Sequence, residues 1–323
     1  MPSLAQDNPP APQLNDVFFK NLKVRAIGPA VMGGRVSDIA IDPRNPALFY
    51  VGLATGGVFK TSDNGVSFEP IFDKEATQSI GAVAVAPSDS DVVWVGTGEP
   101  NDRNSSGWGN GIYRSTDGGG TWQNVGLKDS REIARVIVHP TNPEIAYVAA
   151  LGHLWADGGD RGLFKTTDGG KNWKAVLQGP APHAARVGCG DVAFDPSNPE
   201  VVYAALYARQ RAPWGFTFGP AFTGGEDVGG IFKSTNGGTT WKKLGGGLPA
   251  ETGRIGLAVT PGKSESGDGR GPKRSGRQRR ADRHSQQERR SLSLGGWRGK
   301  MDAHERLQPA PVLLQPDSNR SIE

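Results

Sequence analysis

The sequence predicts an all-β protein: a partial, open β-propeller of four-stranded blades, followed by a disordered C-terminal tail. Three observations support this prediction. The 323 residues include 47 Gly and 24 Pro, which suits short strands joined by tight turns. One Asp-Gly turn closed by an aromatic residue recurs four times. The same apolar runs surround each copy, so each unit has an apolar face that only a neighbouring unit can bury.

The recurring segment, here called the Asp turn, reads KTSDNGVSF (60–68), RSTDGGGTW (114–122), KTTDGGKNW (165–173) and KSTNGGTTW (233–241). Its acidic or amide positions are 54, 51 and 68 residues apart, and they are Asp63, Asp117, Asp168 and Asn236. Repeats of this length with four strands each are typical of propeller blades. A β-sandwich, the alternative all-β fold, explains neither the period nor the fixed turn.

Each unit contains four apolar runs, which predict four strands in order. The first run ends in a Pro-containing turn, at 36–46, 80–90, 134–143 and 191–199. It is almost wholly apolar or small, which predicts an innermost strand buried on both faces. A second run comes next, a third leads into the Asp turn, and a short fourth run ends the unit. The predicted blades are 34–72, 79–127, 133–178 and 187–244, with a fifth begun at 253–262 and a disordered lead-in at 1–15.

The Asp turn is interpreted as a structural clasp of the hairpin. A short Asp side chain accepts hydrogen bonds from nearby backbone N–H groups, Gly supplies the positive φ, and the aromatic ring packs on neighbouring strands. The predicted aromatic residues are Phe68, Trp122, Trp173 and Trp241. Asn236 replaces the acid in the fourth copy, which argues against metal or acid chemistry there. The Asp turn also lacks the terminal Glu of an EF-hand calcium loop. Neither a metal nor a cofactor is therefore expected.

The basic charge of the chain lies in its last 61 residues. Residues 263–323 carry 14 Lys and Arg against 8 Asp and Glu, which leaves 23 against 25 in residues 1–262. A nucleic-acid partner, which a high pI alone would favour, is therefore not expected. No run approaches the ~18 apolar residues of a membrane span. The single Cys189 lies among apolar and small residues, which predicts a buried, inert thiol.

The repeat stops abruptly after Gly262, and residues 263–323 are polar and Arg-rich without a strand period. The codons of Met301-Asp302 read Trp one base later, and permissible codons for Leu294–Met301 read Ser-Glu-Asp-Gly-Gly-Glu-Arg-Trp, another Asp turn. We therefore hypothesise that this tail is a frameshift product, which resequencing of the gene would test. The alternative is a genuine Arg-rich interaction tail. Separately, an open propeller would expose strand edges, through which the protein could self-associate.

Three long loops join second strands to third strands, at 99–110, 152–161 and 208–229. Long loops on a rigid scaffold commonly carry binding sites. Their aromatic and charged side chains suit an extended peptide or a carbohydrate. The predicted ligand-binding residues are Arg103, Trp108, His153, Trp155, Arg161, Arg209, Arg211 and Trp214. No residue is assigned a catalytic role, and an enzyme would draw on the carboxylates Glu99, Asp102 and Asp160.

The Asp turns resemble the Asp-box, or BNR repeat, over about residues 16–262. The stretches FKNLKVRAIGPAVMGGRVSDIAIDPRNP and GWGNGIYRSTDGGGTW further resemble bacterial sortilin-type proteins that are often labelled glycosyl hydrolase BNR repeat. The resemblance implies that 19–29 corresponds to a closing propeller strand. Xyloglucanases of this type carry an Asp just before the Gly-Gly of the first blade, where this chain has Thr55. Sialidases use an arginine triad and a Tyr nucleophile, and no matching pattern is present.

The function expected from these residues is therefore a non-catalytic, sortilin-like propeller that binds a peptide, a protein or a glycan. A glycoside hydrolase of xyloglucanase or sialidase type, with an incomplete catalytic site in this chain, is the alternative. A scaffold without a ligand also stays open. The resemblance implies a location outside the cytoplasm, and Ser3-Leu4-Ala5 suits the end of a signal-peptidase site, although the sequence contains no complete signal peptide.

Overall fold

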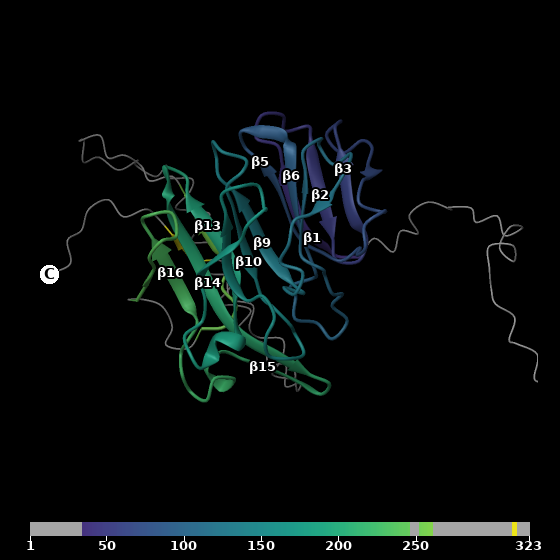
Figure 1. The fold of residues 1–323 in the computed structure, drawn as a ribbon. Helices are drawn as coiled ribbons and strands as arrows, with labels where there is room; N and C mark the ends of the chain where they lie inside the picture. Colours follow the sequence, from purple (N-terminus) through teal and green to yellow (C-terminus); the bar gives the residue numbers. More distant parts are fainter. Residues whose placement is uncertain (1–33, 246–251, 261–311, 315–323) are drawn as a thin grey trace, which may run out of the picture.

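The computed structural model describes residues 34–245, 252–260 and 312–314, and these residues form an all-β propeller with four blades (Figure 1). Blade 1 contains β1 (Val36–Ile41), β2 (Phe49–Leu53), β3 (Gly57–Thr61) and β4 (Glu69–Pro70). Blade 2 contains β5 (Ile80–Ala86), β6 (Asp89–Thr97), β7 (Ile112–Ser115) and β8 (Gln123–Asn124). Blade 3 contains β9 (Ile133–Val138), β10 (Ala146–Ala150), β11 (Gly162–Thr166) and β12 (Lys174–Leu177).

Blade 4 contains β13 (Val187–Asp195), β14 (Asn198–Ala212), β16 (Gly230–Ser234) and β17 (Lys242–Lys243). Two short 3₁₀ helices, His183–Ala185 and Gly219–Ala221, lie beside it. A separate pair joins β18 (Leu257–Val259) to β19 (Val312–Leu314) in parallel. The predicted lead-in, the strand at 19–29 and most of the tail lie outside the described residues. The predicted all-β propeller of four-stranded blades is confirmed.

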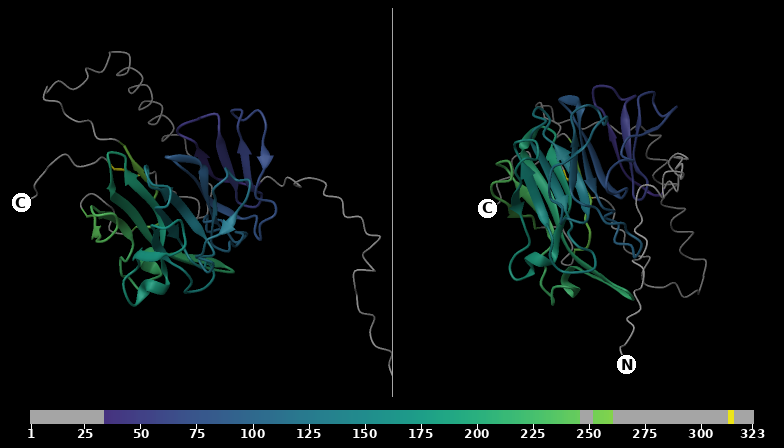
Figure 2. Two further views of the ribbon diagram at one scale, coloured as in Figure 1. Left: turned by 45° about the horizontal axis from the view of Figure 1, so that its top comes forward. Right: turned by 45° about the vertical axis from the view of Figure 1, so that its right-hand side comes forward.

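Each blade is an antiparallel meander whose strands follow one another in chain order, and the blades fan out about a common axis (Figure 2). The first strands β1, β5, β9 and β13 contact one another in turn, so they are the innermost strands. The apolar runs of β5, β9 and β13 are mostly buried because neighbouring sheets cover both of their faces, whereas β1 is exposed on one face, contrary to the sequence prediction. Three apolar cores lie between successive blades, and they are centred on Phe72 with Val83, on Trp94 with Val136, and on Tyr147 with Val192.

The Asp turns connect each third strand to the fourth through a repeated set of hydrogen bonds. Asp117 Oδ1 accepts the Thr121 N–H at 2.8 Å and the Ser115 hydroxyl at 2.7 Å. Asn236 Oδ1 accepts the Thr240 N–H at 2.9 Å, so an amide forms the same turn without a charge. The turn also joins blades, because Trp122 Nε1 donates to the carbonyl oxygen of Ile71 in the preceding blade at 2.8 Å. These contacts are structural ones.

Because of the Asp turns, the free energy of unfolding should depend on pH in the acid range. Hydrogen bonds from side chains and backbone lower the pKa of Asp63, Asp117 and Asp168 to about 2. A carboxyl whose folded pKa lies below its unfolded value stabilises the fold above that unfolded value, and the contribution is lost as pH falls from about 4 to about 2. We expect Asp117→Asn to retain the fold and to show a smaller drop in urea midpoint over this range.

The matched control for this experiment is Asp73→Asn, at an exposed aspartate outside the turns. It should keep the full drop in urea midpoint of the unmodified chain. An equal drop in both variants would show that the hydrogen bonds of Asp117 do not contribute to acid unfolding.

One position of the first strand faces the propeller axis in every blade. It holds Asp38, Ala82, Arg135 and Asp191, whose cross-strand partners are equivalent residues of the second strands. Arg135 Nη1 lies 3.2 Å from Asp38 Oδ1, and its Nε lies 3.1 Å from Asp191 Oδ1. A single side chain therefore links blades 1, 3 and 4. Blade 2 contributes only a methyl group at this position.

The two ends of the blade series differ in what covers them. Ile39 and Ile41 of β1 are 53% and 57% exposed, whereas the equivalent Val83 and Val85 of β5 are buried against blade 1. Blade 1 thus exposes the face by which each later blade packs on its predecessor. At the other end β18 covers the inner part of blade 4, and the Leu257 N–H donates to Asp191 Oδ2 at 2.8 Å. The equivalent hydrogen bond between blades 2 and 1 runs from the Val83 N–H to Asp38 Oδ2 and measures 3.1 Å.

One segment differs from the sequence prediction. The sequence predicts a loop at 208–229, but β14 continues to Ala212 and pairs with β15 (Gly215–Phe218) to form a projecting hairpin. Pro213 and Trp214 form the two-residue turn of this hairpin, since Ala212 pairs directly with Gly215. Cys189 is buried as predicted, and burial raises the pKa of its thiol.

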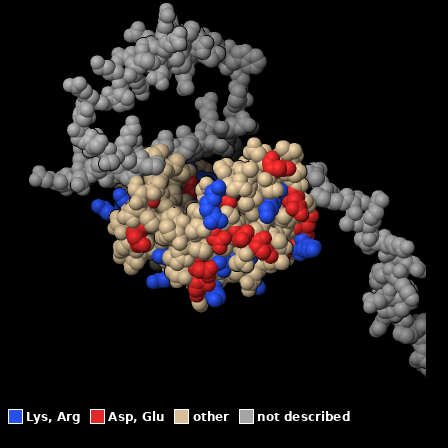
Figure 3. All heavy atoms as spheres, turned by 90° about the horizontal axis from the view of Figure 1, so that it is seen from above, with Lys and Arg blue, Asp and Glu red and all other residues tan. Residues whose placement is uncertain are grey.

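The described residues contain no helix long and apolar enough to cross a membrane. They also contain no cluster of three His, Cys, Asp or Glu side chains arranged to hold a metal ion. On the face opposite the β14–β15 hairpin, acidic and basic side chains are interspersed across the described part of the molecule (Figure 3).

Candidate functional site

The three long loops meet at the end of the strands opposite the Asp turns, on a surface that we call the loop face. It comprises residues 99–110, 152–161 and 208–229. Direct contacts join the loops: Gln210 Nε2 donates to Asp157 Oδ1 at 3.2 Å, and the Arg211 N–H donates to the carbonyl oxygen of Leu154 at 2.8 Å. Asp102, in turn, forms an ion pair with Arg209. The sequence separates these residues widely, and the propeller brings them together.

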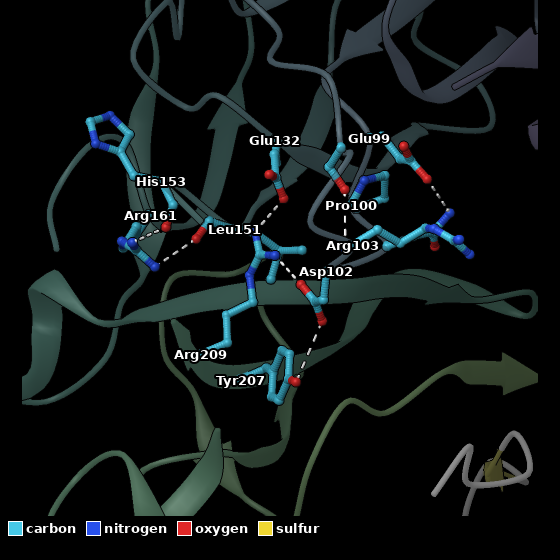
Figure 4. Close-up of polar contacts among 12 residues, drawn as sticks. Glu99, Pro100, Asp102, Arg103, Glu132, Leu151, His153, Arg161, Tyr207 and Arg209 are labelled. Atoms are coloured by element: carbon cyan, nitrogen blue, oxygen red, sulfur yellow. Dashed lines mark hydrogen bonds and ion pairs between the residues drawn. The ribbon is translucent and has the colours of Figure 1, made fainter. Parts of the chain in front are cut away.

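Arg209 is the centre of a buried charge cluster beneath the loop face (Figure 4). Its guanidinium pairs with Asp102 of blade 2 and lies 2.5 Å from Glu132 Oε2 of blade 3, and both Arg209 and Glu132 are fully buried. Tyr207 lies beside them, 3.5 Å from Asp102 Oδ2. Since three blades contribute to it, the cluster fixes the positions of the loops relative to one another.

Glu132 is the most perturbed acid of the cluster. Burial raises its pKa to about 7, against the opposing effect of Arg209. Its Oε2 accepts from Arg209, while Oε1 has no hydrogen-bond partner among the described residues. A carboxyl with this pKa can take up or release a proton near neutral pH. It is buried, however, and so does not contact solvent.

A second ion pair joins blades 1 and 2 at the same level. Arg35 Nη2 lies 2.5 Å from Glu99 Oε2, and its Nε donates to Glu99 Oε1 at 2.8 Å. The Glu99 side chain is fully buried, and Asn101 Nδ2 donates to it at 3.2 Å. The charge of this carboxylate is therefore compensated within the protein. The segment that precedes β18 also contacts this loop, because Arg254 Nη1 donates to the carbonyl oxygen of Pro100 at 2.9 Å.

The structure buries two of the predicted ligand-binding arginines, Arg209 and Arg161. Arg161 is 2% exposed and donates to backbone carbonyls of its own loop, including those of Leu151 at 2.8 Å and Ala156 at 2.7 Å. Burial and the neighbouring Arg209 lower its pKa to about 10. Its contacts shape the 152–161 loop from beneath. The physical reason is that a planar guanidinium with five donors can satisfy several carbonyls at once.

The other predicted ligand-binding residues lie at the surface of the loop face. Trp214 is 99% exposed at the tip of the β14–β15 hairpin, and Trp108 is 59% exposed. The guanidinium of Arg131 lies 5.2 Å from the Trp108 ring centroid and supports one side of it. The remaining four are less prominent: Arg103 is exposed, Trp155 is half-buried, Arg211 stacks on Phe216, and His153 Nε2 lies 2.8 Å from Asp129 Oδ1.

The structure does not bring any two of the three catalytic candidates together as a pair of free carboxyl groups. Glu99 pairs with Arg35, and Asp102 pairs with Arg209. Asp160 lies in another loop, beside Asp129, and its partial burial raises its pKa. A glycosidase needs two carboxyl groups that flank the same bond. No such free pair occurs among these three residues.

Sequence analysis missed Glu132 and Arg35, which are the partners of Arg209 and Glu99. Both stand directly before the first strand of a blade, where blade 2 has Ser79. Ser79 also contacts the loop face, since its hydroxyl donates to the carbonyl oxygen of Gly107 at 2.9 Å. A comparison of the residues that precede each first strand could have found this site, because that position lies under the loops in all three blades.

Comparisons with known proteins show which propellers this chain is similar to. Residues 110–249 match the Sortilin-Vps10 family model, described as sortilin, neurotensin receptor 3. A xyloglucanase from Paenibacillus sp is 27% identical over 66% of this chain and 21% of its own length. A probable oligoxyloglucan-reducing end-specific xyloglucanase from Neosartorya fischeri is 28% identical over 56% of this chain and 24% of its own length. The chain thus spans about a fifth to a quarter of these relatives.

Among solved structures, the chain matches the GH74 xyloglucanase from Xanthomonas campestris. It has a TM-score of 0.46 and 19% identity over 68% of this chain and 30% of that chain. The predicted resemblance to sortilin-type Asp-box propellers is confirmed by the family model.

Proposed function

We propose that this sortilin-type Asp-box propeller binds an extended peptide or a glycan on its loop face and does not turn it over. The observation that carries the proposal is the arrangement of the loop face. Exposed aromatic rings stand above a buried, charge-compensated base, with Trp214 99% and Trp108 59% exposed. Exposed aromatic side chains on a rigid scaffold suit the flat faces of sugars and the side chains of an extended peptide.

The state of the carboxylates favours binding over catalysis. Glu99 and Asp102 are each neutralised by a buried or half-buried arginine, and Glu132 is held by Arg209 beneath the surface. A general acid or a nucleophile must reach the scissile bond. These carboxylates instead hold the loops in place, which preorganises the surface for a ligand.

A glycoside hydrolase is the second candidate, and one observation favours it. The pKa of Glu132 is raised to about 7 by burial, the range that suits a general acid. The curated relatives are named xyloglucanases, and this chain covers only part of them. In this alternative the hydrolase is a longer protein, and Glu132 becomes accessible through movement of the Asp102 loop.

We further propose that the protein acts outside the cytoplasm. The support is indirect: the matching family model is that of a receptor, and the relatives carry names of enzymes that act on a polysaccharide. Fractionation of the native organism, with detection of the chain in the periplasm or medium, tests this proposal. Recovery in the cytoplasm alone contradicts it.

The proposed function predicts that Trp214→Ala weakens ligand binding without affecting the fold. Because the Trp214 side chain is 99% exposed, its removal should leave the thermal midpoint unchanged. We expect Kd for a xyloglucan oligosaccharide or a selected extended peptide to rise by about tenfold, or ~1.4 kcal/mol. Isothermal titration calorimetry after a glycan and peptide screen measures this change.

The matched control is Phe68→Ala, at an exposed aromatic residue on an Asp turn at the other end of the strands. It should leave Kd unchanged. Release of reducing sugar is monitored on the same glycans. Turnover that disappears in Glu132→Gln would favour the hydrolase over the binding protein. Equal losses of affinity in the Trp214 and Phe68 variants would show that the ligand does not bind at the loop face.

A further inference from the structure

Every blade carries a cation stacked on an aromatic ring, and in blades 1 to 3 this pair faces the next blade. The aromatic residue lies on the second strand and the cation on the third. The distances from the charged atom to the ring centroid are 5.8, 5.3, 5.1 and 5.3 Å for Lys60–Tyr50, Arg114–Trp94, Lys165–Tyr147 and Lys233–Tyr203. We call each pair the latch of its blade.

The Tyr–Lys latches of blades 1 and 3 hold the Asp turn of the following blade. In blade 1, Tyr50 Oη and Lys60 Nζ both donate to the carbonyl oxygen of Gly118, at 3.0 and 2.9 Å. In blade 3, Tyr147 Oη and Lys165 Nζ both donate to the carbonyl oxygen of Gly237, at 2.8 Å each. The acceptor is the same position of the Asp turn in both cases. Its positive φ, 66° and 61°, turns the carbonyl toward the preceding blade.

The Trp94–Arg114 latch of blade 2 has different chemistry but the same position. Arg114 forms an ion pair with Glu144 of blade 3. The Asp turn of blade 3 also lies directly against the guanidinium, since a Cβ added to Gly169 would stand 2.5 Å from Arg114 Nη1. All three internal latches therefore contact the turn of the next blade.

The latch of blade 4 has the same geometry as the Tyr–Lys latches of blades 1 and 3, each of which binds a carbonyl oxygen. Tyr203 and Lys233 occupy the positions of Tyr147 and Lys165, and their strands pair with each other as in the other blades. Within residues 34–245 and 252–260, neither Tyr203 Oη nor Lys233 Nζ has a hydrogen-bond acceptor. Next to them β18 occupies the first-strand position of a fifth blade, as its bond from Leu257 to Asp191 shows.

We propose that blade 4 and β18 together form a receptor for an Asp-turn hairpin of another polypeptide. The partner is a three-stranded unit equivalent to strands two to four of a blade, with the sequence Ser/Thr-x-Asp/Asn-Gly-Gly. Its turn glycine places a carbonyl oxygen on Tyr203 and Lys233, and its first strand takes the place of β19 beside β18. The interface continues the contact that already joins blades 1 and 2, and blades 3 and 4. This receptor is separate from the loop face, so it does not depend on the ligand proposed there.

The test uses the full chain and a synthetic peptide of residues 87–126 as the probe. This peptide contains the strands and Asp turn of blade 2, whose natural contact is the Tyr50–Lys60 latch. The three internal latches are occupied in the folded chain, so calorimetry should show one peptide bound per chain. We expect the double variant Tyr203→Phe, Lys233→Met to raise Kd by about tenfold or more.

The matched control is Lys242→Met, which removes the same charge from an exposed lysine paired with Lys233 across the sheet. It should bind the peptide as the unmodified chain does. Circular dichroism and the thermal midpoint establish that each variant is folded, and Tyr203→Phe alone provides a milder change that keeps the ring. Absence of binding at millimolar peptide, or equal Kd values for the double variant and the control, overturns the proposal.

Discussion

Replacement of Arg209 by alanine is expected to lower the free energy of unfolding by about 3–5 kcal/mol, the range for breaking a buried ion pair from one side. Arg209 is fully buried and pairs with both Asp102 and Glu132. Its removal leaves the buried Glu132 carboxyl without its partner, and a cavity where the guanidinium lay. Chemical denaturation in urea near pH 8 measures the loss.

The pH dependence of this loss identifies its cause. The folded pKa of Glu132 already lies near 7, above the ordinary value of 4.5. An acid whose pKa is raised on folding binds more protons in the native state, so its contribution to stability is present below the unfolded pKa and is lost as pH rises toward the folded one. Without Arg209 that pKa rises further. The variant should therefore regain part of its stability at about pH 5, where Glu132 is protonated.

The matched control adds Glu132→Gln to the Arg209→Ala variant and so removes the charge that Arg209 would have compensated. The double variant Arg209→Ala, Glu132→Gln should be more stable than Arg209→Ala near pH 8, because no unpaired charge stays buried. It should also show a smaller recovery at about pH 5. Equal losses at both pH values in Arg209→Ala would mean that the cavity, and not the buried charge, determines the effect.

Replacement of Gly81 by alanine is expected to cost about 3 kcal/mol or more, at the upper end for overpacking. Gly81 lies in the bulge of β5. A Cβ there would stand 2.0 Å from the carbonyl oxygen of Ile133 in blade 3 and 2.4 Å from that of Gly98. Both obstacles are backbone atoms, so no side-chain rotation relieves the clash. Blades 2 and 3 would have to separate.

The measurement is again the urea midpoint, with Gly215→Ala as the control. Gly215 lies in the projecting hairpin, and an added Cβ there meets no atom within 4 Å. Its substitution should change stability by no more than about 0.5 kcal/mol. A stable Gly81→Ala variant with an unchanged midpoint would show that the close approach of the two blades is not required for the fold.

The repeated Asp turn was sufficient to predict the blades, because the turn chemistry is local. The side chain of Asp117 reaches residues only four positions away, so the sequence contains the whole interaction. The innermost position of the first strands could also be predicted, since burial on both faces demands an apolar run. β1 departs from that pattern: Ile39 and Ile41 are exposed because no other blade among the described residues packs on them, whereas the equivalent Val83 and Val85 are buried.

The charge cluster beneath the loop face could not be predicted in the same way. Arg209 contacts residues 77 and 107 positions earlier, and no spacing rule connects such residues. The sequence predicts Arg161 and Arg209 as ligand contacts because charged groups beside aromatic rings on long loops suit a sugar or an extended peptide. Here the propeller stacks those loops on one another, so the same arginines end beneath the surface, whereas Trp214 stays above it.

The latch has a consequence for how the sequences of the blades can diverge. Tyr50 and Lys60 recognise a main-chain carbonyl of the next blade, and so do Tyr147 and Lys165. A backbone oxygen is present whatever side chain the position carries. Neighbouring blades therefore need no matched pairs of substitutions at these contacts, and a duplicated blade finds a ready acceptor on its new neighbour. Gene duplication can lengthen or shorten such a propeller one blade at a time, while each blade changes its loops independently.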